Sequence, residues 1–452
     1  MTIIEYVPRL RTRGAVVHPG DPSWDAARQA WNLAVDQQPA AVAFPADEAD
    51  VASLVRYARA AGLRVAPQRT GHNAAPLGSL EDTIILRTDA LRGVEIDAAN
   101  RRARVRSAAK WEDVVPAASD LGLAGLHGST GDVSVVGYTL GGGLGWYARK
   151  HGLAANRVTA VELVTADGEL VRADADNEPE LFWALRGGGG NFGVVTALEF
   201  DLIEQAADYA GVLFFPWERA DEVLHAWHEW LPTTPDEITS VGRIMQFPPF
   251  PDVPEPLRGN AFALVEAVHL GTEDEGRELL APLRALGPAI DTFATVPPAA
   301  IAELHMDPPK PVPGVTGSRL LGELSPQAVD ELLAVAGPGS GSTLLSVELR
   351  QLGGALAQSA PEHGAIDTLV GEYAYFGVGI APVPEIAAAN ERRLDRLAAA
   401  LAPYDAGRAY SNFTESNGGI DRFFDAETSA RLRAVKADVD PDGVFQANHE
   451  ID

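Results

Sequence analysis

The sequence predicts an α+β protein, in which an α/β part is followed by a part built on an antiparallel sheet. Three observations support this class. A strand, a helix and a strand follow one another with short joints between residues 40 and 66. Two hairpin patterns lie within residues 94–107 and 160–173. From about residue 206, helical and strand patterns alternate between proline-rich joints.

The first unit is predicted to be a parallel crossover. Residues 40–44 form a short apolar run that ends at Pro45. Residues 47–61 carry apolar side chains at helical spacing, and Gly62 closes that helix as a left-handed cap. Residues 63–66 form the next strand. A strand, helix and strand with such short joints are typical of parallel pairing, with ligands at the carboxyl end of the second strand.

A β-rich section follows this unit, and a mixed section follows from about residue 206. In the first section we expect a strand at 83–87, hairpins at 94–97/102–107 and 160–165/169–173, a helix at 178–185 and a strand at 194–202. In the second we expect helices at 220–230, 273–286 and 385–401 and strands at 240–246, 261–269, 342–349 and 372–380. The pattern favours one antiparallel sheet with helices on one face. The tail from about residue 404 carries a further helix at 426–435.

Composition excludes several classes of function. The formal net charge is -27, from 63 acidic and 36 basic residues, which argues against nucleic-acid and anionic-membrane partners. Cysteine is absent, which excludes disulfides, thiolate catalysis and cysteine-bound metals. No export signal or membrane-spanning run is recognised, so a cytoplasmic protein is expected. His225 and His228 share a helix face without a third ligand, so no metal site is predicted.

Three glycine-dense loops indicate a ligand that approaches the backbone closely. They are residues 69–73, 141–145 and 186–193, each next to an apolar strand or helix. Bare amide N–H groups in such loops can bind anionic oxygens, so a phosphate-bearing cofactor is favoured. The loops match neither the Walker A nor the strict Rossmann pattern. His72 lies in the first loop.

Five stretches together resemble the vanillyl-alcohol-oxidase/PCMH superfamily, in its berberine-bridge-enzyme-like branch of FAD-linked oxidases. The stretches are residues 44–61, 69–73, 136–145, 178–196 and the ending formed by 410–413 with 440–445. They follow the family order over nearly the whole chain. The resemblance implies a PCMH-type FAD-binding domain of two α/β subdomains plus a substrate domain with an antiparallel sheet covered by helices. The implied division is residues 1–205 (core about 37–205), 206–403, and 404–452 returning to the FAD domain.

The resemblance implies FAD bound covalently through His72, at the 8α-methyl of the flavin ring. Many relatives add a link through a cysteine eight residues before the position of Tyr138, and that position is Thr130 here, so only single attachment is possible. The further cofactor-binding residues expected are Arg69, Thr70, Gly71, Asn73, Ala74, Gly131, Asp132, Ser134, Gly137, Gly141, Gly142, Gly143, Gly145, Val195 and Asn448.

The catalytic base stays open at this point. Relatives often use a tyrosine from a Tyr-x-Asn-Tyr motif, which reads Tyr410-Ser-Asn412-Phe413 here, so the second aromatic cannot act as base. Tyr410 is one candidate, with Asn412 as a hydrogen-bonding partner. The alternatives are Glu348, Tyr373 and Tyr375, the last two on one side of a predicted strand. Tyr138 is expected near the flavin edge.

The expected function is an FAD-dependent oxidase. It would transfer hydride from an alcohol, sugar or natural-product carbon to flavin N5, with O2 as electron acceptor and a small molecule as substrate. Two alternatives remain: a dehydrogenase or oxidative cyclase that reacts slowly with O2, and a noncatalytic flavin-binding protein, for which the Phe413 substitution argues. The substrate and the oligomeric state do not follow from the sequence.

Overall fold

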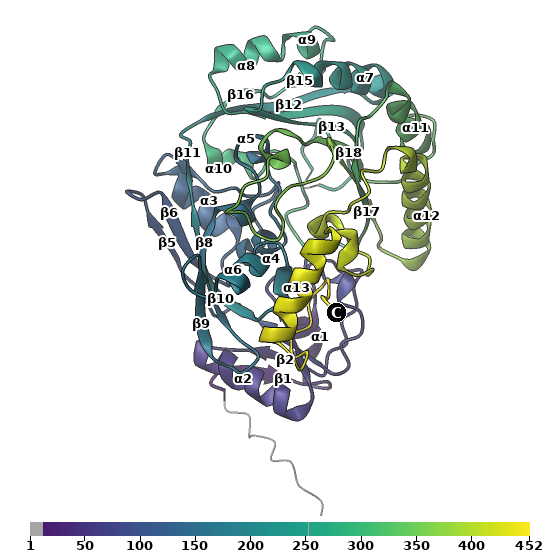
Figure 1. Ribbon diagram of the computed structural model, residues 1–452. Coiled ribbons are helices and arrows are strands. Elements are labelled where there is room, and N and C mark those ends of the chain that lie inside the picture. The colour runs from purple at the N-terminus through teal and green to yellow at the C-terminus, as the bar shows by residue number, and fades with distance from the viewer. Residues whose placement is uncertain (1–11, 252) are drawn as a thin grey trace, which may run out of the picture.

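The computed structural model describes residues 12–251 and 253–452, so residues 1–11 of the expected N-terminal domain lie outside the described part. Three large sheets form the frame of this part (Figure 1). The first has the strand order β1-β2-β4-β3 and the second β5-β6-β10-β8-β9. The third has the order β15-β12-β14-β13-β18-β19-β17, with β16 paired to β12. No helix in the described ranges is long and apolar enough to span a bilayer.

The first sheet contains the predicted crossover. β2 (Ala41–Phe44), α2 (Glu48–Ala61) and β3 (Arg64–Gln68) form as expected. Asp47 caps α2 by accepting from the Asp50 N–H at 3.0 Å. β4 (Thr83–Arg87) lies between β2 and β3 and pairs with both in parallel, so the crossover skips one strand. The carboxyl end of β3 therefore leads directly into the loop that carries His72.

The second sheet is antiparallel and comes from the two predicted hairpins. These are β5 (Val94–Asp97) with β6 (Arg102–Arg106), and β8 (Val158–Val164) with β9 (Leu170–Asp174). β10 (Val194–Asp201) joins them in the centre of the sheet. Further elements of this half are β1 (Ala15–Val17), α1 (Trp24–Arg28), α3 (Trp111–Ser119), β7 (Leu123–Ala124), α5 (Ala148–His151), α6 (Pro179–Leu185) and β11 (Ile203–Glu204).

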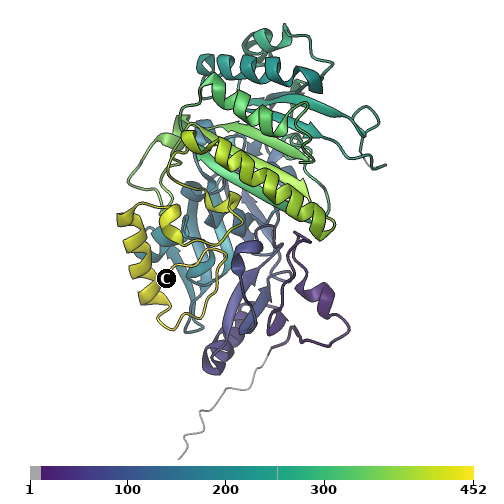
Figure 2. The same ribbon diagram turned by 90° about the vertical axis from the view of Figure 1, so that its right-hand side faces the viewer.

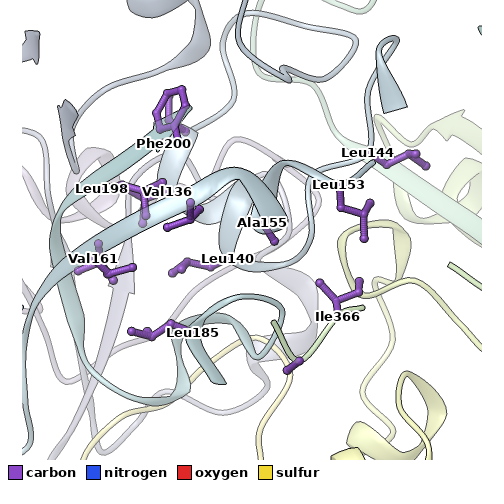
Figure 3. Packing of buried hydrophobic residues seen from close by; sticks show 14 of the residues in the cluster. Val136, Leu140, Leu144, Leu153, Ala155, Val161, Leu185, Leu198, Phe200 and Ile366 are labelled. Atoms are coloured by element: carbon purple, nitrogen blue, oxygen red, sulfur yellow. The ribbon is translucent and has the colours of Figure 1, made fainter. Parts of the chain in front are cut away.

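The short helix α4 (Val135–Leu140) lies over the second sheet. Val136 and Leu140 belong to one core cluster with Val161 of β8 and Leu198 of β10 (Figure 3). Burying a side chain of this size stabilises the fold by about 1.5–3 kcal/mol. Since α4 is anchored on the sheet by these contacts, the glycine-rich loop that follows it is held in a fixed place.

The third sheet carries helices on one face, as predicted. Its central strands are β12 (Asp208–Pro216), β13 (Ile238–Gln246), β14 (Ala261–His269), β17 (Gly314–Leu321), β18 (Ser346–Gln351) and β19 (Tyr373–Ile380). The covering helices are α7 (Ala220–Trp230), α11 (Pro326–Ala336) and α12 (Pro384–Ala400), and the shorter elements are α8 (Glu273–Leu279), α9 (Ala281–Arg284), β15 (Ile290–Asp291), β16 (Ala294–Val296) and α10 (Pro298–Ile301). Figure 2 shows the yellow-green α12 lying along the green strands.

Two element predictions in this half were wrong in detail. The helix expected at 273–286 is broken into α8 and α9 at Leu280, because Pro282 has no N–H to continue the helical bonding. The strand expected at 342–349 begins only at Ser346. There the Ser342 hydroxyl accepts from the Leu344 N–H at 3.3 Å, a local bond that competes with sheet pairing.

The C-terminal segment returns to the first sheet. α13 (Ala426–Val439) runs beside the N-terminal half in yellow (Figure 1). Beyond it, Phe445 forms a parallel bridge with Val65 of β3. The Val65 N–H donates to the Val444 carbonyl at 2.7 Å, and the Gln446 N–H donates to the Val65 carbonyl at 3.0 Å. The end of the chain thus closes over the same edge as the His72 loop.

Candidate active site

A cavity of about 940 Å³ lies between the glycine-rich loops and the uncovered face of the third sheet. Its lining joins residues far apart in sequence, including His72, Tyr138, Gly190, Glu348 and Tyr410. A volume of this size falls in the range that cofactor and small-molecule sites occupy.

His72 is held on three sides. Gly71 before it has φ +80°, a left-handed conformation that a side chain would disfavour. The His72 Nδ1 lies 2.9 Å from the Thr70 hydroxyl, and its Nε2 lies 3.2 Å from the Asp132 carboxylate. The Trp31 ring stacks on the imidazole with 4.3 Å between the ring centroids. The Trp31 indole N–H also donates to Asp132 at 2.6 Å, so the three side chains form one unit.

Three glycines leave open space that the protein itself does not fill. A Cβ at Gly137 would meet nothing nearer than Ser134 at 3.9 Å, and one at Gly189 nothing nearer than Asn191 at 4.0 Å. A Cβ at Gly190 would meet only Ala447, at 4.0 Å. All three glycines line the cavity, so their missing side chains make room for a ligand lying against the backbone.

Buried polar atoms around the same space lack protein partners. They include Gln68 Oε1, Asn73 Oδ1, Ser107 Oγ and Tyr138 Oη, whose residues all line the cavity. An unpaired buried polar group costs about 1–3 kcal/mol, so such groups normally have a partner. The bare glycines and the unpaired polar atoms together fit a polar, phosphate-bearing cofactor such as FAD.

The structure places the predicted cofactor residues in two groups. Those that line the cavity are Arg69, Thr70, Gly71, His72, Asn73, Ser134, Gly137, Gly141, Val195 and Asn448. Those that lie outside the lining are Ala74, Gly131, Asp132, Gly142, Gly143 and Gly145. For the last three the protein itself explains the glycine. A Cβ at Gly145 would lie 1.8 Å from the His127 carbonyl oxygen, and one at Gly143 would lie 2.5 Å from Ala154.

Tyr410 and Asn412 brace the loop after α4. The Tyr410 hydroxyl accepts from the Leu144 N–H at 3.0 Å and from the Asn412 amide at 3.2 Å. Asn412 also donates to the Tyr138 carbonyl at 2.9 Å. Burial raises the pKa of the Tyr410 hydroxyl, against the opposing effect of its hydrogen bonds. Tyr410 is therefore a neutral hydrogen-bond donor at neutral pH, and a poor proton acceptor.

Phe413 lines the cavity beside Tyr410, with 5.1 Å between the ring centroids. Tyr138 faces the same space from α4, and burial, followed by the nearby Tyr410, raises its pKa well above the usual value. The aromatic side of the cavity thus holds two neutral phenols and no base that is ionised at neutral pH.

A buried charged network forms the part of the cavity wall that the third sheet provides. Glu348 on β18 accepts from Arg350 at 2.9 Å and lies 2.8 Å from His305 Nε2. The other ring nitrogen of His305, Nδ1, lies 2.5 Å from Glu266 of β14. Arg243 of β13 contacts Glu266 at 3.0 Å. The register pairs Arg243 with Glu348 across neighbouring strands, which aligns these side chains on one face of the sheet.

The network fixes the protonation of its members. Burial opposes the charge on His305, and Arg243 does so too, but Glu266 and Glu348 outweigh them and raise its pKa to about 9. Burial likewise disfavours the charge on Glu348, yet Arg350 and His305 hold its pKa well below the usual range. At neutral pH the site therefore presents an ionised carboxylate flanked by two cations.

Tyr373 and Tyr375 do not reach the cavity. Both belong to the core cluster between the third sheet and its helices, and burial raises the pKa of Tyr373 to about 12. They share one side of β19, as the spacing predicts, but that side faces the helices. The cavity-facing residues of β19 are Phe376, Val378 and Ile380.

Sequence reasoning missed part of this site, namely Trp31, Arg243, Glu266, His305 and Arg350. His305 lies in an irregular segment after α10, where no periodicity marks it. Arg243 is the single charge of β13, and Arg350 shares β18 with Glu348; charged residues are rarely buried unless paired, so charges in central strands are a signal of a polar site. His225 and His228 of α7 are both half-buried, and His228 Nε2 lies 2.9 Å from the Leu324 carbonyl. Among the described residues, His225 gathers with Asp221 and Asp330, whose ligand atoms lie within 4.8 Å of one another, away from the cavity.

Two family models match the chain. The family described as "FAD binding domain" matches residues 39–174, and the family described as "Berberine and berberine like" matches residues 409–452. These segments carry the His72 loop and the Tyr410 motif. The protein is therefore an FAD-dependent oxidoreductase.

Relatives extend the similarity over the whole chain. (R)-6-hydroxynicotine oxidase from Paenarthrobacter nicotinovorans is 29% identical over 98% of this chain and 97% of its own length. Glucooligosaccharide oxidase from Sarocladium strictum is 34% identical over 40% of this chain and 37% of its own length. The solved structure of 6-hydroxy-D-nicotine oxidase from Arthrobacter nicotinovorans has a TM-score of 0.84 at 27% identity and covers 98% of both chains. The chain belongs to the berberine-bridge-enzyme-like FAD-linked oxidases.

Proposed function

We propose that this enzyme is an oxidase that carries FAD on His72 and oxidises a small, largely apolar alcohol or amine, with O2 as electron acceptor. One observation carries the proposal. A single cavity has the His72 loop and the bare glycines on one side and the ionised Glu348 network on the other. Bound FAD would supply the hydride acceptor and the reaction with O2.

Glu348 is the proton acceptor in this proposal. A carboxylate accepts through two oxygens with about four lone-pair sites, and the contacts with Arg350 and His305 leave free sites toward the cavity. Arg350 and His305 keep it ionised, so its free lone pairs are available to accept a hydrogen bond from a substrate hydroxyl or ammonium group and to receive that proton as hydride leaves. The Tyr410 hydroxyl proton would orient the same substrate group, since its oxygen already accepts two bonds.

The substrate class follows from the wall between these groups. It is formed by apolar side chains of the third sheet and the proline-rich segments, among them Met245, Phe247, Val253, Leu257, Val378 and Ile380. A saccharide would leave most of its hydroxyls unpaired against such a wall, at a cost for each. A ring with one hydroxyl or amine group fits better, so (R)-6-hydroxynicotine is the better probe substrate and a glucooligosaccharide the poorer one.

We also propose the chain division 1–205, 206–403 and 404–452. β10 of the second sheet ends at Asp201, and β12 of the third sheet begins at Asp208, which supports the first boundary. The bridge between Phe445 and Val65 supports the return of the last segment. The absence of cysteine supports the expected cytoplasmic location.

The test follows the yellow colour of the protein. Acid precipitation is expected to leave the flavin in the pellet for the native enzyme and in the supernatant for His72→Ala. Native enzyme mixed anaerobically with (R)-6-hydroxynicotine should bleach faster than with a glucooligosaccharide, and air should restore the colour rapidly. Slow recovery in air would favour the dehydrogenase or cyclase alternative. A flavin that no probe bleaches would favour a noncatalytic binder.

A further inference from the structure

Glu415 is a carboxyl group of the cavity lining that the charged network does not include. It follows the Tyr410 motif, is half-buried and lines the cavity. Burial raises its pKa to about 7, the Thr316 hydroxyl opposes this in part, and no charged side chain of the described residues contributes to the shift. The Thr316 hydroxyl oxygen is itself buried and makes no close hydrogen bond. Two polar groups of the cavity therefore lie side by side without a cation.

The other carboxylates of the cavity lining are occupied by protein partners. Glu348 contacts two cations, at 2.9 and 2.8 Å. Asp307 accepts from the Ser129 hydroxyl at 2.8 Å. A carboxylate held away from water is costly unless a cation or hydrogen-bond donors pair with it. Glu415 differs from both in lacking such a partner, and a cationic ligand would supply one.

The part of the lining next to Glu415 in sequence is aromatic. Phe413, two residues before it, packs against Phe376 of β19 with 5.1 Å between the ring centroids, and both rings line the cavity. Arg350 lies over the Phe413 ring at 5.6 Å, but its charge is already paired with Glu348 at 2.9 Å. Aromatic faces attract organic cations, so these rings favour an ammonium over an anion as the ligand.

The strand register sets the separation between the two carboxyl groups. Glu348 of β18 pairs with Phe376 of β19, and Phe376 pairs with Ser318 of β17. Thr316, whose hydroxyl acts on Glu415, lies two residues before Ser318 on the same face. With strands about 4.8 Å apart and about 3.4 Å per residue, the Cα atoms of Glu348 and Thr316 are about 12 Å apart. Phe376 lies between them, so a ligand that reaches both ends has room for one ring over Phe376.

We propose that Glu415 is a specificity-determining residue that binds an ammonium group of the substrate, across a ring from the group that faces Glu348. The inference rests on the proposed oxidation of a small alcohol or amine, and it narrows the substrate class to ring compounds that carry a second, cationic nitrogen. An ammonium beside Glu415 holds the carboxyl ionised, and the proton that the carboxyl gives up goes to solvent. The Thr316 hydroxyl then donates to the same carboxylate.

The experiment compares two probe molecules on the flavin-containing enzyme. 4-(Aminomethyl)benzyl alcohol carries a hydroxyl and an ammonium at opposite ends of one ring, and 4-ethylbenzyl alcohol has the same shape without the charge. Binding is measured at pH 8 by anaerobic titration calorimetry after the flavin has been reduced, so that no turnover occurs. The proteins are the native enzyme, Glu415→Gln and Asp307→Asn. The last is the matched control, because it removes a negative charge from the same lining.

We expect the native enzyme to bind the ammonium probe about 10- to 100-fold more tightly than the neutral one, as a hydrogen bond to a charged group implies. Glu415→Gln should lose most of this preference by weakening binding of the ammonium probe alone, and Asp307→Asn should keep it. Equal binding of both probes by the native enzyme would overturn the inference, as would an undiminished preference in Glu415→Gln. An equal loss in Asp307→Asn would also overturn it, because the preference would then come from the overall charge of the cavity.

The proposed oxidation is tested separately with the oxidised enzyme. If neither (R)-6-hydroxynicotine nor either benzyl alcohol bleached the flavin, the proposed function would fail. A Glu415-dependent preference in calorimetry would still support the ammonium site in that case, because that measurement involves no turnover.

Discussion

The two walls of the cavity are built on different principles. The cofactor wall consists of backbone and small residues, such as Gly137 within α4 and Gly190 in the loop before β10. The substrate wall consists of charged side chains, including Glu348 and His305, that come from separate strands and one irregular segment. The glycines of the cofactor wall leave space for a cofactor, and the network of the substrate wall holds an ionised carboxylate. Substitutions should therefore separate binding of the cofactor from chemistry on the substrate.

The largest effect is expected from Glu348→Gln. The amide keeps the shape of Glu348 but cannot take a proton, and general-base groups contribute about 10²–10⁴-fold to a rate. We expect anaerobic reduction of the flavin by (R)-6-hydroxynicotine to slow by that factor in stopped-flow measurements, with the covalent share of FAD unchanged.

The matched control for this change is Glu266→Gln. Glu266 belongs to the same buried network through His305 and Arg243 but does not line the cavity. Its loss should disturb the network and slow reduction less than the loss of Glu348. Equal rate losses in both variants would mean that the network acts only as a scaffold, and the proton acceptor would have to be sought elsewhere.

A second test adds a side chain to the cofactor wall. Gly190→Val places methyl groups where the protein offers no contact except Ala447 at 4.0 Å. Overfilling a packed site costs about 1–3 kcal/mol, so FAD affinity should fall about 5- to 150-fold while the melting temperature of the FAD-free chain stays nearly the same. Retention of FAD is measured by gel filtration in a His72→Ala background.

Gly322→Val serves as the control for added bulk, because Gly322 also has open space, with Tyr404 at 3.8 Å, and lies outside the cavity lining. It should retain FAD like its parent. If Gly190→Val retained the cofactor equally well, the cradle formed by these glycines would not be the binding surface.

A smaller effect is expected for Tyr410→Phe. The variant loses one neutral hydrogen-bond donor to the substrate, worth about 0.5–1.5 kcal/mol, or roughly 2- to 10-fold in the reduction rate. The hydroxyl also accepts from the Leu144 N–H, so the melting temperature should fall as well. A rate loss as large as that of Glu348→Gln would instead make Tyr410 the base, despite its raised pKa.

The contrast between the walls also explains what the sequence could predict. Glycine-dense loops are contiguous, so the cofactor wall was visible as three short motifs with His72 in the first. The network becomes visible only with the strand register, since Arg243, Glu266 and Glu348 lie on three strands. Glu348 was a candidate as a carboxylate on a predicted strand, but its partner His305 had no pattern around it.

Sequence periodicity also showed which residues share one side of a strand, but not whether that side faces the cavity or the hydrophobic core. Tyr373 and Tyr375 were rightly placed on one side of β19, yet only the packing of α12 and its neighbours decides that this side is core. In the same way, Gly143 and Gly145 belong to a glycine motif whose density partly serves close packing against Ala154 and His127. The glycine content correctly indicated a loop that approaches a ligand. Only the tertiary contacts show which of its glycines leave space for the ligand and which allow close packing within the protein.

The last prediction concerns stability rather than catalysis, at Glu415, which lines the cavity. Burial raises its pKa to about 7, and the Thr316 hydroxyl only partly opposes this. The folded state therefore keeps a proton that the unfolded chain releases near its ordinary pKa of about 4.3. Between these values the folded state binds more protons, so stability falls as pH rises and levels off above about pH 7.

Glu415→Gln should remove this loss of stability at high pH, stabilising the protein by about 1–3 kcal/mol at pH 8 and hardly at all at pH 4. Thermal unfolding at both pH values checks this, with the exposed Glu229→Gln as control. An equal gain at both pH values would show that Glu415 is ionised in the fold throughout, and that this wall tolerates an unpaired charge.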